Sequence, residues 1–201
     1  MIRLLLADDQ ALIRGALAAL LGMEPDLAVV AEVGRGDEVV PAAIEHRPDV
    51  ALLDVQMPGL DGLAAAGALR AQVPGCRVLM LTTFGRPGYL RRALGAGASG
   101  FMVKDAPPEQ LVAAIRRVHA GLRVVDPALA VESMTVGESP LTARECDVLA
   151  AAADGGAVAD IARRLFLSEG TVRNHLSSII GKTGARTRAD AARIATERGW
   201  V

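Results

Sequence analysis

The sequence predicts an α/β fold, with a flavodoxin-like doubly wound sheet of five parallel strands, followed by a small all-α domain that contains a helix-turn-helix. Two observations predict it. Short apolar runs alternate with segments of helical periodicity through the first 120 residues, and only helical segments follow residue 140. The chain has 201 residues and is 51% apolar, so it can build one core of ordinary size and one smaller core.

The predicted strands are near-continuous apolar runs, a pattern typical of parallel strands that are buried on both faces. They are Ile2–Ala7, Ala28–Glu32, Val50–Leu53, Val78–Leu81 and Gly100–Val103. The helical segments between and after them are Ala11–Leu21, Gly36–His46, Gly62–Gln72, Tyr89–Ala96 and Pro108–Ala120. Five such units in a row predict a parallel sheet with helices on both faces, whose ligands bind at the carboxyl ends of the strands.

A change in pattern near residue 120 divides the chain. Residues 121–137 have weak periodicity and contain an Asp-Pro pair, which predicts a linker with a short helix around Ala128–Glu132. The first domain is therefore expected over residues 1–120 and the second over residues 138–201. The helices predicted in the second domain are Ala143–Ala153, Val158–Leu165, Glu169–Thr183 and Ala189–Arg198.

Charge and cysteine content narrow the class of protein. The net charge is only −1, but from Ile161 onward eight basic residues face three acidic ones, which predicts a local anion site such as a DNA backbone. Cys76 and Cys146 lie in apolar surroundings, as structural thiols do in a reducing cytosol. No apolar run approaches the roughly 18 residues of a membrane helix, and no signal peptide is evident. We expect a cytoplasmic protein.

Five chemistry-bearing side chains follow the strands of the first domain. Asp8 and Asp9 follow the first strand, and Asp54, Thr82 and Lys104 stand at the ends of the third, fourth and fifth. These points converge on one edge of a doubly wound sheet. Three carboxylates at one edge repel one another unless a cation is bound, and Mg²⁺ prefers such oxygen ligands. The pocket therefore suits nucleophilic phosphoryl chemistry on an aspartate, with the metal and a lysine balancing charge.

Residues 1–120 resemble a receiver domain. The matching residues are Asp8-Asp9, Asp54-Val55-Gln56-Met57-Pro58-Gly59, Thr82 and Lys104. The resemblance implies that Asp54 accepts the phosphoryl group, that Asp9 and Asp54 bind Mg²⁺ directly, that Asp8 binds it through water, and that the backbone carbonyl of Gln56 is the third protein ligand. It also implies that Thr82 is the switch hydroxyl, that Lys104 pairs with the phosphate and that Phe101 is the switch aromatic. Phe101 can also be interpreted as an ordinary core aromatic in a strand, and the two interpretations are compatible.

The chain departs from the commonest receiver pattern at three positions. Thr83 replaces a small residue, Phe84 stands where many receivers carry a polar side chain, and Asp105 stands where many carry proline. Positions such as Phe84 border the path of the attacking water in this family. We hypothesise that Phe84, together with Gln56, changes the lifetime of the phosphorylated state.

Two other classes of protein compete with this interpretation. An aspartyl-phosphate hydrolase needs a second acid two residues after its nucleophile, and Gln56 stands there instead. A phosphorylation-independent adaptor with the same fold would be favoured by the loss of Asp8, Asp9 or Lys104, and all three are present. The resemblance implies a phosphoacceptor that catalyses its own phosphorylation and dephosphorylation, rather than an enzyme that turns over a substrate.

The second domain contains the signals of a helix-turn-helix. Thr142 and Glu145 have the spacing of a capping box, which predicts a helix start at Ala143, and Ser168 is the predicted N-cap of the third helix. Helical periodicity turns Val172, Leu176, Ile179 and Ile180 inward. It turns Arg173, Asn174, Ser177 and Ser178 outward, with Thr171 and His175 near the edges. Arg pairs with guanine and Asn with adenine in the major groove, whereas Lys182, Arg186 and Arg188 are expected to contact phosphates.

This domain resembles the LuxR/NarL/FixJ type of output domain. The matching residues are Leu141-Thr142, Arg144-Glu145, Ile161-Ala162, Leu167-Ser168, Thr171-Val172, Asn174-His175 and the tail Gly184–Thr187. Leu81–Tyr89, Gly170–Asn174 and Gly199-Trp200 are similar to regulators of the DesR type, which answer membrane-bound histidine kinases. The resemblance implies double-stranded DNA, a sensor histidine kinase whose phosphohistidine donates the phosphoryl group, homodimerisation on phosphorylation, and RNA polymerase as a further partner. Interdomain release and receiver dimerisation both stay open as the activating step.

Overall fold

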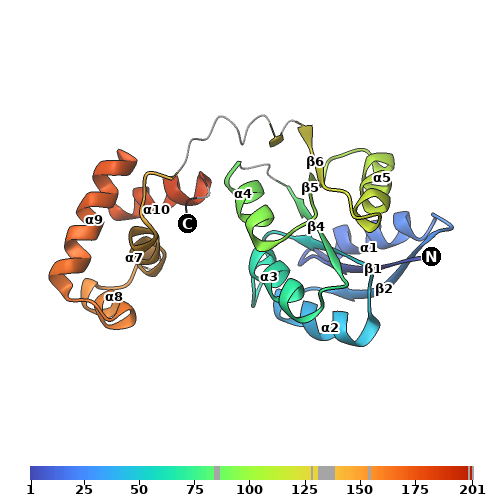
Figure 1. Ribbon diagram of the computed structural model, residues 1–201, viewed down its shortest axis with the longest axis horizontal. Coiled ribbons are helices and arrows are strands. Elements are labelled where there is room, and N and C mark those ends of the chain that lie inside the picture. The colour runs from blue at the N-terminus through green and yellow to red at the C-terminus, as the bar shows by residue number, and fades with distance from the viewer. Residues whose placement is uncertain (84–86, 128, 131–138, 154, 199, 201) are drawn as a thin grey trace. The chain divides into compact units, whose positions relative to one another are not determined.

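The computed structural model of the protein describes residues 1–201 except 84–86, 128, 131–138, 154, 199 and 201 (Figure 1). The described residues fall into two compact units that divide close to residue 131. The short helix expected around Ala128–Glu132 lies mainly outside the described residues. None of the described helices has the length and apolar character that crossing a membrane requires.

The first unit is built on a parallel sheet in the strand order β2-β1-β3-β4-β5-β6. All five predicted strands form, with ends within one residue of those expected, so the α/β prediction is confirmed. The sixth strand adds only two residues, which lie in the segment expected to be a linker and pair with Gly100 and Phe101 of β5. The strands are β1 (Ile2–Ala7), β2 (Leu27–Val33), β3 (Val50–Asp54), β4 (Arg77–Thr82), β5 (Gly100–Val103) and β6 (Val124–Val125).

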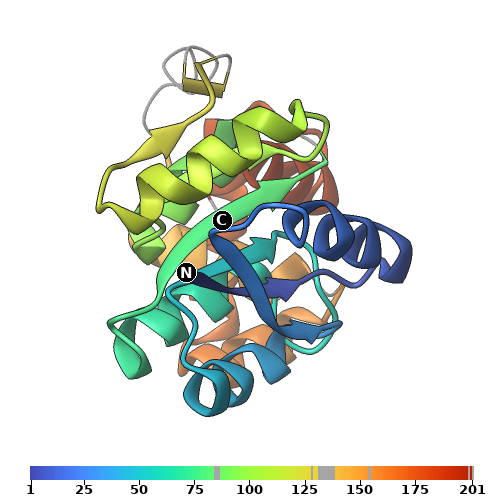
Figure 2. The same cartoon turned by 90° about the vertical axis from the view of Figure 1, so that its right-hand side faces the viewer.

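Helices cover both faces of this sheet. Helices α1 and α5 lie on one face and α2, α3 and α4 on the other (Figures 1 and 2). Alternate strand residues serve the two cores: Leu4 and Leu6 pack with α1 and α5, whereas Leu5 and Leu53 pack with α2 and α3. The segment predicted as one helix over 36–46 begins as a separate 3₁₀ turn. The elements are α1 (Ala11–Leu21), η1 (Gly36–Glu38), α2 (Val39–His46), α3 (Gly62–Gln72), α4 (Pro87–Ala96) and α5 (Pro108–His119).

The start of α3 holds the end of β3 in place. Asp61 caps the helix by accepting from the Ala64 backbone N–H at 2.7 Å. The backbone N–H of Gly62 donates to the Val55 carbonyl at 3.0 Å. A Cβ on Gly62 would lie 1.8 Å from the Asp54 carbonyl oxygen, so only glycine allows this approach. The backbone on both sides of Asp54 is thereby fixed.

The second unit packs four helices around one core: α7 (Ala143–Ala153), α8 (Val158–Leu165), α9 (Glu169–Thr183) and α10 (Arg188–Glu197). Both predicted caps form, because the Thr142 hydroxyl accepts from the Glu145 N–H at 3.3 Å and the Ser168 hydroxyl accepts from the Thr171 N–H at 3.1 Å. Val172, Leu176 and Ile179 on the inward side of α9 are buried as expected, whereas Ile180 is only partly buried. The unit is therefore a helix-turn-helix in which α8 and α9 are the paired helices.

Candidate metal centre and nucleic-acid interface

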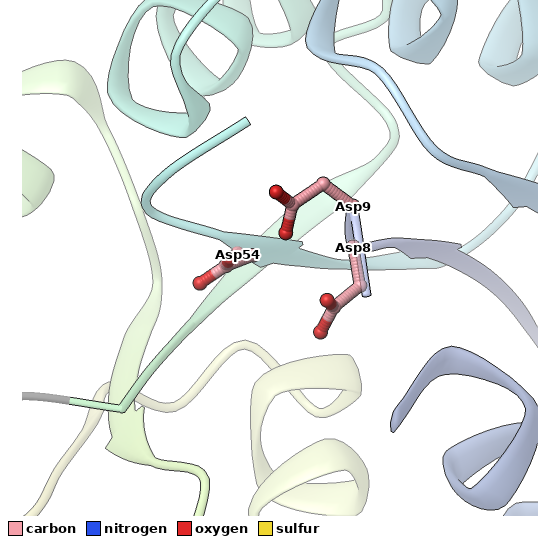
Figure 3. A group of neighbouring side chains, drawn as sticks. All are labelled: Asp8, Asp9 and Asp54. Carbon is pink, nitrogen blue, oxygen red and sulfur yellow. The ribbon is translucent and has the colours of Figure 1, made fainter. Parts of the chain in front are cut away.

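The five predicted pocket residues converge at the carboxyl end of the sheet. Asp8 and Asp9 follow β1, Asp54 and Thr82 end β3 and β4, and Lys104 follows β5. Asp8, Asp54 and Thr82 are buried, with exposed fractions of 3%, 6% and 4%. Figure 3 shows the three carboxylates approaching one another from two neighbouring strands, and one oxygen from each lies within 4.8 Å of the others.

Lys104 connects two of these carboxylates. Its ammonium lies 2.7 Å from Asp8 Oδ2 and 3.2 Å from Asp54 Oδ1, and its side chain is only 7% exposed. The Lys104 backbone N–H donates to the Thr82 carbonyl at 2.7 Å, which sets the direction in which the lysine leaves β5. One buried cation therefore faces three carboxylates, and the pocket keeps a net negative charge.

The surroundings of Asp54 make its carboxyl a weaker acid than a free aspartate side chain. Burial raises the pKa of its carboxyl above the ordinary value; Lys104 opposes this effect, and the nearby Asp8 adds to it. The Val55 backbone N–H donates to Asp54 Oδ1 at 2.8 Å. A further cation beside Asp9 and Asp54 would balance the excess charge, so the donor set fits a hard divalent ion such as Mg²⁺.

The remaining predicted receiver residues lie around this pocket. Phe101 is completely buried in the core between the sheet and helices α2 to α4, where β5 pairs it with Met80. The side chain of Gln56 is exposed two residues beyond Asp54, and Asp105 is exposed beside Lys104. Phe84, on which the lifetime hypothesis depends, lies outside the described residues.

Most of the predicted base-reading residues form one exposed face of α9. Arg173, Asn174 and Ser177 are exposed, and Thr171 and His175 are half-buried at the edges. Arg173 forms an ion pair with Glu169 one turn earlier, at 2.6 Å. That exposed i,i+4 pair is weak, so it keeps the guanidinium near the start of the helix but still leaves it available to another partner.

Three other residues that are predicted to contact DNA form hydrogen bonds to groups of their own domain. The Ser178 hydroxyl donates to Glu145 Oε1 at 2.7 Å, and the Lys182 ammonium donates to Glu145 Oε2 at 2.7 Å. Arg188 donates to the carbonyls of Gly156 and Gly155 at 2.8 and 3.0 Å, which holds the segment before α8. The sequence predicts neither the contacts to Glu145 nor those to the two carbonyls.

Glu145 has a role in the structure beyond the helix cap that the sequence predicts, because it connects α7 to α9. Its carboxylate is 4% exposed and accepts from Thr142, Ser178 and Lys182. Burial opposes the ionised form, but these hydrogen bonds outweigh it and lower the pKa of Glu145 to about 2. The only signal in the sequence is an acid at a position where a helix packs inward, and that signal does not identify partners more than thirty residues away.

Comparisons with known proteins agree with both halves of this arrangement. A family model described as the response regulator receiver domain matches residues 4–116, and one described as bacterial regulatory proteins of the luxR family matches residues 139–195. The transcriptional regulatory protein DesR of Bacillus subtilis is 42% identical over 200 residues, spanning 100% of this chain and 99% of the relative. The uncharacterized transcriptional regulatory protein YvfU of the same organism is 44% identical over 201 residues and the full length of both chains.

A solved structure shares the whole architecture. The crystal structure of the response regulator ChrA, from a heme-sensing two-component system, aligns with a TM-score of 0.60 at 34% identity and covers 100% of this chain and 98% of its own. The receiver domain of this chain is thus followed by a luxR-type helical domain, and both lie within the length that the chain shares with these relatives. The chain belongs to the LuxR/NarL/FixJ family of two-component response regulators, which are transcriptional regulators with a receiver domain and a DNA-binding domain.

Proposed function

We propose that Asp54 accepts a phosphoryl group from the phosphohistidine of a membrane-bound sensor histidine kinase, and that the phosphorylated chain dimerises and binds double-stranded DNA in the cytoplasm. The observation that carries this proposal is the position of the Asp54 carboxylate, which is buried between two further acids and Lys104 at the carboxyl end of the sheet. We further propose that residues 1–120 act as the receiver, 121–137 as the linker and 138–201 as the DNA-binding domain.

Mg²⁺ is the cofactor that these donors support. Asp9 and Asp54 would bind it directly, Asp8 through water, and Gln56 through its backbone carbonyl. When bound, the ion neutralises charge on the phosphoryl oxygens. Every one of these ligands is an oxygen, which favours Mg²⁺ over zinc or copper.

The chain's own residues account for the transfer and the switch. A carboxylate oxygen of Asp54 attacks phosphorus while the phosphorus–nitrogen bond to histidine breaks, and Lys104 pairs with the incoming phosphoryl oxygens. The Thr82 hydroxyl donates to one of those oxygens, and Phe101 fills the space behind it. Water later attacks the same phosphorus, the bond between phosphorus and the Asp54 oxygen breaks, and inorganic phosphate leaves as the carboxylate is restored. The chain is thus a self-modifying phosphoacceptor rather than an enzyme with a released substrate.

The output follows from the exposed face of α9. Arg173 and Asn174 would read base edges from the major groove, with Thr171, His175 and Ser177 beside them. Ser178 and Lys182 are also exposed, as is Arg186 beyond the end of α9. Lys182, Arg186 and Arg188 would meet phosphates of the DNA backbone. Two output domains of a dimer would read half-sites about one helical turn apart. RNA polymerase is a further partner for a regulator of this kind.

Acetyl phosphate with Mg²⁺ tests the phosphoacceptor role. Intact-mass measurement should show a single phosphorylation of the full chain, and Asp54→Asn should abolish it. Asp105→Asn is the matched control, because Asp105 is an exposed aspartate beside Lys104 with the same charge to lose. Labelling of the Asp54→Asn protein at the parent rate, or loss of labelling in both variants, would refute the assignment.

A further inference from the structure

A polar pocket lies at the end of the receiver sheet opposite to Asp54. Its volume is about 510 Å³, and its walls come from the ends of α3 and α4 and from the amino ends of β4, β5 and β6. Three arginines line it: Arg70 at the end of α3, Arg77 at the start of β4 and Arg123 just before β6. No aspartate or glutamate is among the lining residues.

Two of these arginines lie close to glycines with left-handed backbone. Arg70 lies across Gly97, whose φ is +94°, and a Cβ there would stand 2.4 Å from Arg70 Cδ. Arg77 lies close to Gly121, whose φ is +87°, and its Nη1 donates to the His119 carbonyl at 2.7 Å. Gly97 thus leaves room for the Arg70 side chain, and the hydrogen bond to His119 orients the Arg77 guanidinium before any ligand arrives, which lowers the entropy lost on binding.

The positive charge of the pocket is not balanced within the described residues. No carboxylate in that part of the chain forms an ion pair with Arg70, Arg77 or Arg123, whereas Arg116 on the same domain pairs with Glu24 and Asp26. Asp49 lies close enough to Cys76 to help raise the pKa of its thiol, but it accepts the Arg3 backbone N–H at 2.8 Å and does not line the pocket. Three arginines that line one pocket, with no acid among the lining residues, attract an anion.

We propose that this pocket binds a small phosphomonoester, with the phosphate on Arg70, Arg77 and Arg123. Arginine presents a planar fork of donors that matches phosphate oxygens, and the Ser99 hydroxyl adds another donor. The volume exceeds that of inorganic phosphate and lies in the range of small-molecule sites. Val78 and Leu94 offer apolar walls for the rest of the ligand.

The Cys76 thiol and the arrangement of the lining residues indicate a binding site for a compact ligand and not a catalytic site. Cys76 also lines it, but burial raises the pKa of this thiol to about 12, so the sulfur serves as a wall and not as a nucleophile. The three arginines line a single pocket, which favours a compact ligand over the extended backbone of a nucleic acid. The site is separate from the acidic pocket, since it opens at the other ends of the same parallel strands.

Arginine side-chain NMR on the full chain tests the proposal. Inorganic phosphate and ribose 5-phosphate are titrated at constant ionic strength without Mg²⁺, while the Nε–Hε signals and the Gly97 and Ser99 amides are followed. We expect saturable shifts at Arg70, Arg77 and Arg123, with ribose 5-phosphate binding more tightly. The double variant Arg70→Gln, Arg123→Gln should weaken binding at least about tenfold, because each lost fork removes charge-assisted hydrogen bonds.

The matched control is Arg47→Gln, Arg117→Gln, which changes the charge equally at exposed arginines outside this pocket. Its affinity should stay within about twofold of the parent. The proposal would be overturned if both double variants weakened the binding of ribose 5-phosphate equally, or if no signal shifted saturably. Shifts centred on Lys104, or displacement of bound ribose 5-phosphate by a short DNA duplex, would overturn it as well. If the double variant loses its native amide spectrum, the single Arg123→Gln change replaces it, since Arg123 is exposed.

Discussion

The ammonium of Lys182 lies 2.7 Å from the buried carboxylate of Glu145, so a lysine near the end of α9 binds an acid on the first turn of α7. Ser178, one turn earlier on α9, donates to the other carboxylate oxygen at 2.7 Å. Two contacts a turn apart fix the rotation of α9 about its axis. The direction in which Arg173 and Asn174 face outward therefore depends on Glu145, which itself faces inward.

Loss of Lys182 should destabilise the DNA-binding domain. Lys182→Met leaves the Glu145 carboxylate buried without its cation, and we expect the free energy of unfolding to fall by roughly 2 kcal/mol. Trp200, the single tryptophan of the chain, lies in this domain and reports its urea unfolding by fluorescence. Arg186→Met is the control, because it removes the same charge from an exposed side chain. Equal losses in both variants would contradict the role given to Lys182.

The same carboxylate should make the stability of this domain depend on acid. The pKa of Glu145 is lowered to about 2 in the folded state from an ordinary value of 4.5. Its contribution is therefore complete above the unfolded pKa and is lost as the pH falls from about 4.5 toward about 2. Between about pH 5 and about pH 2.5 the parent should lose roughly 2 kcal/mol more than Glu145→Gln does. Parallel curves for the two proteins would exclude this linkage.

Two glycines of α3 should respond oppositely to alanine. In Gly62→Ala the new Cβ would stand 1.8 Å from the Asp54 carbonyl oxygen, so β3 or α3 must move, and we expect a loss of at least about 3 kcal/mol. Gly67→Ala places its Cβ in open space on the same helix and should gain up to about 1 kcal/mol from helix propensity. Thermal unfolding compares the two, and a similar melting temperature for both variants would show that the contact is not rigid.

Lys104 should weaken the binding of Mg²⁺ while it supports the phosphoryl group. Lys104→Met removes a positive charge 2.7 Å from Asp8 and 3.2 Å from Asp54, so we expect the Mg²⁺ affinity to rise about tenfold. Labelling by acetyl phosphate should slow in the same variant. Calorimetric Mg²⁺ titration measures the first effect, with Arg117→Met as an exposed control on the same domain. Unchanged affinity in Lys104→Met would remove Lys104 from the charge balance of the pocket.

Arg173 and Arg186 should differ in how they affect DNA recognition. Arg173→Ala should cost about 1–3 kcal/mol on specific sites and relax the preference at one base pair. Arg186→Ala should weaken all sequences alike and lower the salt dependence of binding by about one ion. Sites selected genome-wide by the phosphorylated parent supply the DNA, and quantitative binding at several salt concentrations separates the two effects. An unchanged base preference in Arg173→Ala would place that side chain outside the major groove.

Local patterns in the sequence were sufficient for the fold and for the pocket. Apolar runs and helical periods determined where the strands and helices lie, because each residue's burial repeats with the geometry of its own element. Asp8, Asp54 and Lys104 then met at one edge, because parallel strands bring their carboxyl ends together whatever the details of packing. The caps at Thr142 and Ser168 followed from contacts that span only three residues.

What the sequence by itself determined is the class of each element, the acidic edge of the sheet and the outward face of α9. Only the tertiary structure decided that Lys182 and Ser178 bind Glu145, and that Arg188 holds the carbonyls before α8. It also decided that three arginines line one pocket at the other end of the sheet, with no carboxylate among its lining residues. Periodicity tells which side of a helix a residue faces. It does not tell which residue from a distant segment lies there, because that depends on how whole helices and strands pack in three dimensions.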